Sequence, residues 1–471
     1  MLCGEPSCGP SPRSRPPGIQ KGDHPMTEGR ILPKLIRYAI PLIIINVTQM
    51  LFSTIDVAIL GQFAGDAAVA AVGTTGSLIQ LITGLFFGLA SGVNVAVAHA
   101  VGAKDLDTAR RATSTAILTA LVCGAMLTAI SIPCARTFLQ WMKCDPAVID
   151  LAVRYLRIYF LGMPIMMAYN FIAAALRASG DSLRPMIVML TSGAVKVLSN
   201  FALVGGLRLG VAGAAYSTLI SMMLSMVMMT TVLFHSEKLR PDRLEICKPQ
   251  LVRIVQVGVP SGMSSLFFYA ANAVIQTAVN SLGTTAMPAN AIASQYDSFV
   301  YVVGSAFAAT CMAFVGQNMG ARKLERVKHV IRISITVTTI ACTVVGLFFV
   351  LLGQPLCSFV TSDPQVIAIA RQRMLILCMT YFTSGIMEIL SLSLSSMGWF
   401  KVTMVVGFFC GLGARVIWTW VFWPMFGSLA SLYASFPISN ILAIIVYLFI
   451  LRGAVRKLAL TMKNSETEVA Q

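Results

Sequence analysis

Ionisable residues lie inside long apolar stretches of this chain, where charged side chains are rare. Asp56, Lys196, Glu388 and Arg415 are each flanked mainly by hydrophobic residues. Because an ionised group is costly to place in hydrocarbon, such a residue is expected to face a partner or a water-filled cavity. A desolvated carboxylate can carry a proton, and one that stays ionised can help to coordinate a cation. The chemistry indicated is therefore the binding of a proton, a cation or a charged substrate.

Glu388 and Asp297 are further candidates for a site in the second half of the chain. Glu388 has apolar neighbours on both sides and corresponds to Asn170 in the first half, since 388 − 170 = 218. A lone glutamate there is not expected to face lipid, which indicates a proton site or a site for a cationic substrate. Asp297 follows Gln295 and Tyr296 and is the next candidate.

The two basic residues leave alternatives open. Lys196 and Arg415 occupy nearly equivalent positions in the two halves, since 415 − 196 = 219. Either can line a cavity, but Lys196 can also extend its long stem to the membrane interface. Arg415 can instead cap backbone carbonyls or anchor its helix at an interface.

The elements that carry these residues must be membrane-spanning helices. Of 471 residues, 56% are hydrophobic and 11% are charged, against roughly a quarter charged in a soluble domain, which excludes a water-soluble enzyme of this size. About 20 apolar residues cross a bilayer as a helix. The sequence predicts an all-α membrane protein with twelve such spans, near residues 34–59, 68–98, 112–134, 150–176, 185–206, 211–234, 252–280, 287–317, 329–353, 366–395, 402–424 and 429–451.

The basic residues predict the orientation of the spans. The net charge is +16, and Lys and Arg collect in the even-numbered links, although Arg154, Arg157, Arg371 and Arg373 lie on the opposite side. Such residues accumulate on the cytoplasmic side of membranes. We therefore expect a multi-pass protein of the cell membrane with both termini in the cytoplasm, and no nucleic-acid partner.

The second half of the chain repeats the first. Gly102 recurs as Gly320 and Gly180 as Gly398, both at an offset of 218, and Pro41 recurs as Pro260 at 219. An even number of spans per copy gives both copies the same orientation and suggests a substrate path between them. We expect a six-helix bundle over 34–236, a cytoplasmic linker over 237–251 and a second bundle over 252–453.

The remaining segments suggest no catalytic or metal centre. Residues 1–33 are expected to be a disordered cytoplasmic lead-in, with Met1 or Met26 as the start, and residues 454–471 a cytoplasmic tail. The cysteines show no metal-ligand spacing, although Cys134 and Cys144 could pair. His99 and Gln317 are repeat equivalents that favour structural hydrogen bonding over proton relay.

Four motifs resemble the multidrug and toxic compound extrusion (MATE) family. They are the segments 52–61 (FSTIDVAILG), 101–104 (VGAK), 175–181 (ALRASGD) and 314–320 (FVGQNMG), and the likeness runs from about residue 30 to 455. The resemblance implies two six-helix bundles, a central cavity, and export of small amphiphilic, often cationic compounds driven by inward H+ or Na+. No other cofactor is expected, and the chain is expected to act as a monomer in the bilayer.

The resemblance also assigns residues. It makes Asp56 a coupling-ion site, and the positions matching Lys196 and Asn200 carry an amide and a carboxylate in some members of the family. An ammonium beside Asp56 would keep the carboxylate ionised and repel sodium, which favours proton coupling or a relocated site. Other members have a second-lobe acid in the seventh span, where Phe268 and Tyr269 stand here.

Rival functions remain from other classes. A flippase for a lipid or lipid-linked precursor would also suit two six-helix bundles, and Lys196 and Arg415 leave it open. A channel would have no need of an embedded carboxylate. An intramembrane enzyme would need a nucleophile with its base, or metal ligands at helical spacing, and the four His form no such pair.

Overall fold

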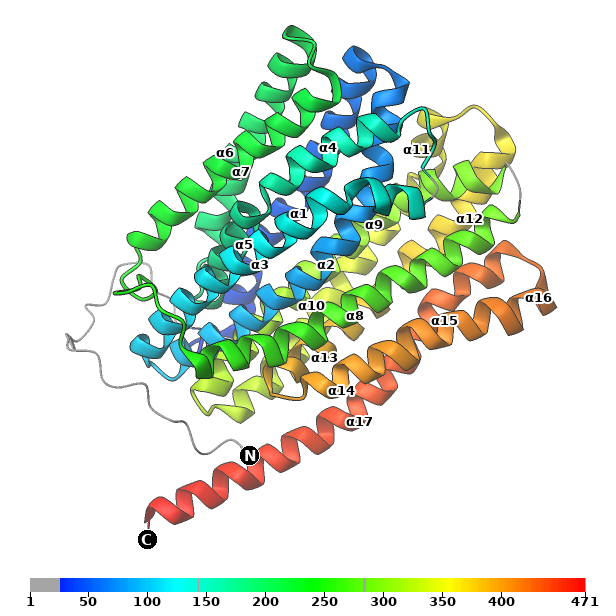
Figure 1. The fold of residues 1–471 in the computed structure, drawn as a ribbon. Helices are drawn as coiled ribbons and strands as arrows, with labels where there is room; N and C mark the ends of the chain where they lie inside the picture. Colours follow the sequence, from blue (N-terminus) through cyan, green and yellow to red (C-terminus); the bar gives the residue numbers. More distant parts are fainter. Residues whose placement is uncertain (1–25, 143, 283–284, 471) are drawn as a thin grey trace. The chain divides into compact units, whose positions relative to one another are not determined.

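The computed structural model describes residues 26–142, 144–282 and 285–470, and their regular structure is helical (Figure 1). Within these described residues, eleven helices are long and apolar enough to cross a membrane, or twelve when one bent pair counts as a span. This confirms the predicted fold class. The first half contains α1 (Ile31–Ala64), α2 (Asp66–Gly102), α3 (Leu106–Trp141), α4 (Ile149–Leu161), α5 (Met163–Ala178), α6 (Leu183–Asn200), the π-helical segment η1 (Phe201–Gly206) and α7 (Gly210–Phe234).

The second half repeats this order with more interruptions. It contains α8 (Lys248–Asn280), α9 (Ala286–Gly320), α10 (Leu324–Leu351), α11 (Gly353–Val360), α12 (Pro364–Thr380), α13 (Phe382–Ser396), α14 (Phe400–Val406), η2 (Gly407–Gly413), α15 (Ala414–Ile417), η3 (Trp418–Phe422), α16 (Trp423–Phe426) and α17 (Leu429–Ala470). The fourth predicted span is the bent pair, because α4 and α5 meet at Gly162 at an angle of 50°. Pro164 opens α5, and a proline has no N–H to continue the hydrogen bonding of a preceding helix.

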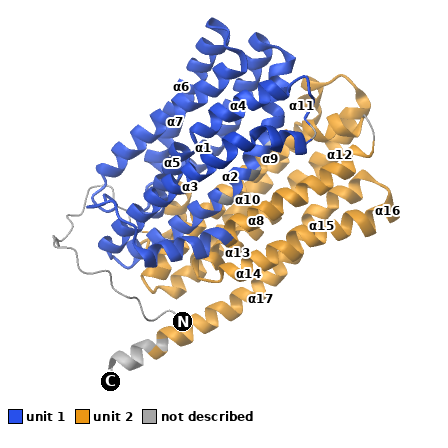
Figure 2. Cartoon of the chain, in the orientation of Figure 1, with its two compact units in different colours: residues 1–25, 40–259 blue, residues 26–39, 260–471 orange. Residues whose placement is uncertain are grey.

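The chain divides into two compact units (Figure 2). Among the described residues, unit 1 comprises 40–259, and unit 2 comprises 26–39 and 260–470. This division falls inside α8, and the predicted linker at 237–251 lies within unit 1. The first turns of α8 belong to unit 1 because they pack closely on α2: a side chain at Gly92 would collide with the backbone carbonyl of Ile254.

The lead-in to α1 is ordered at its end. Residues 1–25 lie outside the described residues, but Met26 and Thr27, which fall in the segment predicted to be disordered, are buried. Lys323 Nζ donates to the Thr27 carbonyl at 3.0 Å, and Arg326 Nη2 donates to the Glu28 carbonyl at 2.9 Å. These bonds fix the start of α1 within unit 2.

Each unit has a core of closely packed helices. In unit 1, α3 and α5 pack on each other and on α2 through small residues, among them Ala112, Ala116 and Ala175. In unit 2, α9 packs against α10, α12 and α13, and Phe314 is fully buried. Small side chains let helix backbones approach closely, which is how helices associate within a bilayer.

The duplicated motifs adopt the same local conformation in both units. Lys104 and Arg322 have left-handed backbones, with φ of 60° and 56°, at the ends of α2 and α9. Gly180 and Gly398 do the same after α5 and α13, with φ of 106° and 92°. A left-handed residue after a helix end lets backbone amides satisfy its last carbonyls. The repeat seen in the sequence is therefore also a repeat of turn geometry.

Candidate functional site

The first polar cluster lies in unit 1, between α1 and α6. Asp56 of α1 forms an ion pair through Oδ2 with Lys196 Nζ, and its Oδ1 accepts a hydrogen bond of 2.9 Å from Asn200 Nδ2. Lys196 and Asn200 are four residues apart on α6, which places them on one helix face. The structure thus brings together all three residues predicted to form the coupling-ion site.

A close helix contact positions this cluster. Gly193, one turn before Lys196, lies against the ring of Phe52, which is one turn before Asp56, and a side chain at Gly193 would overlap that ring. The two helices therefore approach more closely at this level than larger residues would allow. The Asp56 side chain is 16% exposed and that of Lys196 is 24% exposed, so the ion pair keeps some access to solvent.

Two features of this cluster were not predicted. Asn200 is fully buried, and its Oδ1 has no hydrogen-bond partner among the described residues. Tyr155 of α4 is also buried, and its hydroxyl interacts with Thr218 and lies within electrostatic range of Asp56. Tyr155 stands in an amphipathic stretch of the fourth span, and no spacing in the sequence linked it to Asp56.

The second cluster, in unit 2, is a buried ion pair. Arg373 of α12 donates from Nε and Nη2 to Oδ2 of Asp297 in α9, at 3.0 and 2.8 Å. Its Nη1 donates to Asn290 Oδ1, and its guanidinium lies over the ring of Tyr433 at 5.2 Å. Asp297, predicted as a proton or substrate site, is thus held by an arginine. Buried pairs of this kind are costly to break, so the arrangement favours a structural role.

Glu388 has different surroundings. It lies on α13 and is partly exposed, and within the described part of the chain its carboxylate has no hydrogen bond or ion pair. It lies within electrostatic range of Tyr301 on α9 and Tyr269 on α8. Tyr301 stacks on Phe268 with ring centroids 5.7 Å apart, and Phe268 contacts Tyr269 edge to face. The structure therefore places Glu388 and the predicted Tyr269 at one aromatic surface.

Arg415 contacts the same aromatic surface through Phe268. It is 2% exposed, so it does not anchor α15 at a membrane interface. Nε donates to Ser439 Oγ at 3.0 Å and Nη1 to Asn272 Oδ1 at 3.1 Å, while the rings of Phe436 and Phe268 lie 4.4 and 5.6 Å from the guanidinium. Within the described residues no carboxylate lies within ion-pair distance of it.

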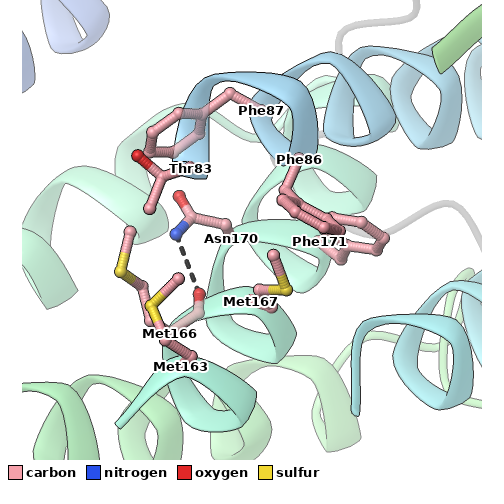
Figure 3. A pocket seen from close by; sticks show the side chains of 8 residues that line it. All are labelled: Thr83, Phe86, Phe87, Met163, Met166, Met167, Asn170 and Phe171. Atoms are coloured by element: carbon pink, nitrogen blue, oxygen red, sulfur yellow. Dashed lines mark hydrogen bonds between the residues drawn. The ribbon is translucent and has the colours of Figure 1, made fainter. Parts of the chain in front are cut away.

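Asn170 lines a pocket in unit 1 between α2 and α5 (Figure 3). Its amide donates to the Met166 carbonyl at 2.8 Å. The pocket is small, and its lining is largely thioether and aromatic. The lining residues are Thr83, Phe86, Phe87, Met163, Met166, Met167, Asn170 and Phe171. Asn170 thus lies among apolar side chains, whereas its repeat equivalent Glu388 lies near aromatic side chains.

Other candidate groups have structural roles. Arg253 Nη2 lies 2.7 Å from His99 Nδ1, which agrees with structural hydrogen bonding by that histidine. Cys134 and Cys144 are both free thiols. Over residues 26–142, 144–282 and 285–470, no group of three or more His, Cys, Asp and Glu side chains is arranged to hold a metal ion.

Comparison with known proteins places these clusters in context. The MatE family model matches residues 41–202 and 260–421, two copies offset by 219 residues. The chain is 25% identical to "Probable multidrug resistance protein YoeA" of Bacillus subtilis over 80% of this chain and 84% of that protein. It is 26% identical to "Probable multidrug resistance protein NorM" of Thermotoga maritima over 72% and 75% of the two chains.

The fold agrees with a solved structure. A crystal structure of MATE in complex with MaL6 superposes with a TM-score of 0.86 at 21% identity, and covers 92% of this chain and 98% of that one.

Proposed function

Because the chain belongs to the MatE family of membrane transporters, and so is not an enzyme, we propose that it is a secondary active antiporter exporting organic compounds in exchange for inward protons. The substrates are small cationic or amphiphilic molecules. The observation that carries the proposal is the ion pair of Asp56 with Lys196 beside Asn200.

The Asp56–Lys196 pair can couple proton binding to a change of structure. A proton on Asp56 removes its negative charge and with it the attraction to Lys196. Protonation and the ion pair are therefore mutually exclusive states of α1 and α6. In the proposed cycle, a proton entering from outside opens the pair, and its loss to the cytoplasm restores the pair.

A proton fits this site better than a sodium ion. Both carboxylate oxygens of Asp56 already face donors, Lys196 Nζ and Asn200 Nδ2. A second cation held about 4 Å from the ammonium would be repelled by about 4 kcal/mol at an effective dielectric constant of about 20. That is roughly a thousandfold in affinity. A proton also gives up the attraction between Asp56 and Lys196, but it binds one carboxylate oxygen and needs none of the further oxygen ligands that a sodium ion would require.

Two surfaces support the substrate class. The Glu388 carboxylate has no ion-pair partner among the described residues, and it lies near Tyr269 and Tyr301. Aromatic faces attract organic cations. In unit 1 the pocket around Asn170 offers Met and Phe side chains, which adapt to apolar molecules of different shapes (Figure 3). The first surface therefore suits a positive charge, and the second offers an apolar lining.

The proposal also includes the orientation of the protein in the membrane and its transport cycle. The protein resides in the cell membrane as a monomer with both termini in the cytoplasm, and its two units alternate in opening the path to either side. The relatives reported above are named for multidrug resistance rather than for lipid flipping, so the flippase alternative is not favoured.

The test is efflux of fluorescent organic cations from proteoliposomes under imposed ion gradients. Export should persist without sodium and stop when the pH gradient is collapsed, with proton counter-flow in a fixed ratio to substrate. Export driven by a sodium gradient alone would refute proton coupling, and a conductance without fixed stoichiometry would indicate a channel.

A further inference from the structure

The last helix of unit 2, α17, is longer than a membrane span (Figure 1). Its candidate span runs over Leu429–Met462, which is 34 residues and therefore about 51 Å of helix. The hydrocarbon core of a bilayer is only about 30 Å thick. The first charged residue of α17 is Arg452. The turns from Arg452 onwards therefore lie at the level of lipid headgroups and water.

The membrane span of α17 has a buried face and an exposed face. Ala443 and Tyr447 are 1% and 3% exposed, and they pack within unit 2. Ile445 and Phe449 each lie two residues further on, about 200° around the helix, and are 48% and 68% exposed. Lipid chains are as apolar as these side chains, so the exposed face of the span is the one that meets lipid.

The same two faces continue beyond the span. Ala454 and Leu458, at 0% and 9% exposed, extend the buried face. Arg452, Arg456 and Leu460 extend the lipid-facing one at intervals of four residues, and all three are exposed, Leu460 to 57%. Arginine and leucine on one exposed face are typical of a helix in the headgroup region of a membrane. We call the exposed face from Phe449 to Leu460 the α17 headgroup face.

The two arginines of the α17 headgroup face have no protein partner among the described residues. Neither Arg452 nor Arg456 forms an ion pair or a hydrogen bond there. The sequence from 429 to 464 contains no Asp or Glu. Lys457 differs, because its Nζ lies 5.7 Å from the centroid of the Trp399 ring. Two positive charges about 6 Å apart along one helix face are thus left to a partner outside the chain.

We propose that Arg452 and Arg456 bind the headgroup phosphate of an anionic glycerophospholipid. The planar guanidinium presents donors that match two phosphate oxygens at once. The acyl chains of this lipid lie along the exposed apolar residues that end at Phe449, so one helix face contacts both parts of the lipid. A zwitterionic lipid binds less well, because its own ammonium group offsets the attraction to the two arginines.

A lipid bound at the α17 headgroup face holds the end of α17 at a fixed depth in one leaflet. Each basic residue near an anionic membrane surface contributes roughly fivefold in affinity, so the pair contributes about thirtyfold. That this leaflet is the cytoplasmic one rests on the orientation given under the proposed function. The binding site itself depends only on the contacts of unit 2.

The first test maps the lipid on the full-length protein in phosphatidylcholine nanodiscs. Phosphatidylglycerol with a photoreactive group near its headgroup should label residues 449–460, and photoreactive phosphatidylcholine gives the background. In the R452Q/R456Q variant, labelling at subsaturating lipid should fall about thirtyfold. No preference for phosphatidylglycerol in the wild type would overturn the proposal and leave this face to a protein partner. Loss of labelling when inorganic phosphate replaces chloride at equal ionic strength would identify a site for a soluble anion instead.

The matched control is the K401Q/K457Q variant. It removes the same two charges at the same end of unit 2, because Lys401 lies two residues after Trp399, whose ring Lys457 covers. Labelling of residues 449–460 should persist in this variant. An equal loss in both double variants would show that the lipid responds to net charge and not to a site.

The second test separates lipid binding from folding. Added phosphatidylglycerol should raise the melting temperature of the wild type above its value in phosphatidylcholine alone, because a ligand of the folded state stabilises it. R452Q/R456Q should melt like the wild type in phosphatidylcholine and lack the additional rise. A variant that already melts lower in phosphatidylcholine would give the arginines a role in the fold and refute the site. Neither test requires transport, so failure of proton-driven export would refute the proposed function alone.

Discussion

Each unit has a basic side chain at the same repeat position, but the groups that surround it differ between the units. In unit 1, Lys196 meets the carboxylate of Asp56. In unit 2, Arg415 meets the neutral oxygens of Asn272 and Ser439 and two aromatic rings. The position matching Asp56 is Ile275, since 275 − 56 = 219. Duplication has thus kept a basic side chain at this position in both units and its counter-charge in only one.

The acids of unit 2 show a second difference. Asp297 is bound by Arg373 through two hydrogen bonds, whereas Glu388 has no such partner in the described part of the chain. Burial alone therefore does not distinguish the acids. In the proposed function, Asp56 and Glu388 differ from Asp297 in that a proton or a cation can change their interactions at moderate cost. The expected effects of substitutions follow from this distinction.

Asp56→Asn should have the largest effect on transport. The amide cannot take up a proton at neutral pH, so proton-coupled export should fall to the level of empty vesicles. Expression should be retained, because the Lys196 side chain is 24% exposed and can turn toward water. Efflux of a fluorescent cation driven by a pH gradient measures the effect. Unaltered efflux would remove Asp56 from the mechanism.

Asp297→Asn should have the largest effect on stability. It leaves the buried Arg373 guanidinium without a counter-charge, which costs about 3–5 kcal/mol for pairs of this kind. Thermal melting in detergent should show the loss, and the D297N/R373M double variant should recover part of it. If D297N melts like the wild type but loses proton coupling, Asp297 belongs to the transport machinery instead.

Glu388→Gln should affect cationic substrates without affecting stability. Because the carboxylate has no ion-pair partner among the described residues, the melting temperature should change little. The apparent affinity for an organic cation should fall roughly tenfold, or about 1.4 kcal/mol. A neutral analogue of the same substrate is the control and should be transported as before. Equal loss for both compounds would contradict a charge-specific role.

Arg415→Lys should have the smallest effect and tests the contrast between the two units. Lysine keeps the charge but lacks the planar group that bonds Ser439 and Asn272 and stacks on Phe436, so a loss of about 1–2 kcal/mol is expected. Lys196→Arg is the matched control in unit 1 and should retain its ion pair with Asp56. Melting temperatures that fall equally in both variants would show that the two cations are held alike.

Much of the fold was open to prediction because its causes are local. The apolar windows predicted the spans, and the recurrence of Gly180 as Gly398 predicted two copies, whose matching turns the structure shows. The bend at Gly162 was not predicted, although Pro164 at the start of α5 is a local signal for a break. The boundary of the two units inside α8 depends on the contact of Gly92 with Ile254, which joins helices far apart in the chain.

The candidate site shows the same difference between local properties, which the sequence predicts, and contacts between distant helices, which it does not. The sequence by itself determined which charges enter the membrane, because hydropathy is a property of short windows, and it singled out Asp56, Lys196 and Glu388. Only the tertiary structure decided how the charged residues are paired, since Arg373, the partner of Asp297, and Asn272, the partner of Arg415, come from other helices. Electrostatic interactions act over a few ångströms in space, and no spacing along the chain specifies those distances.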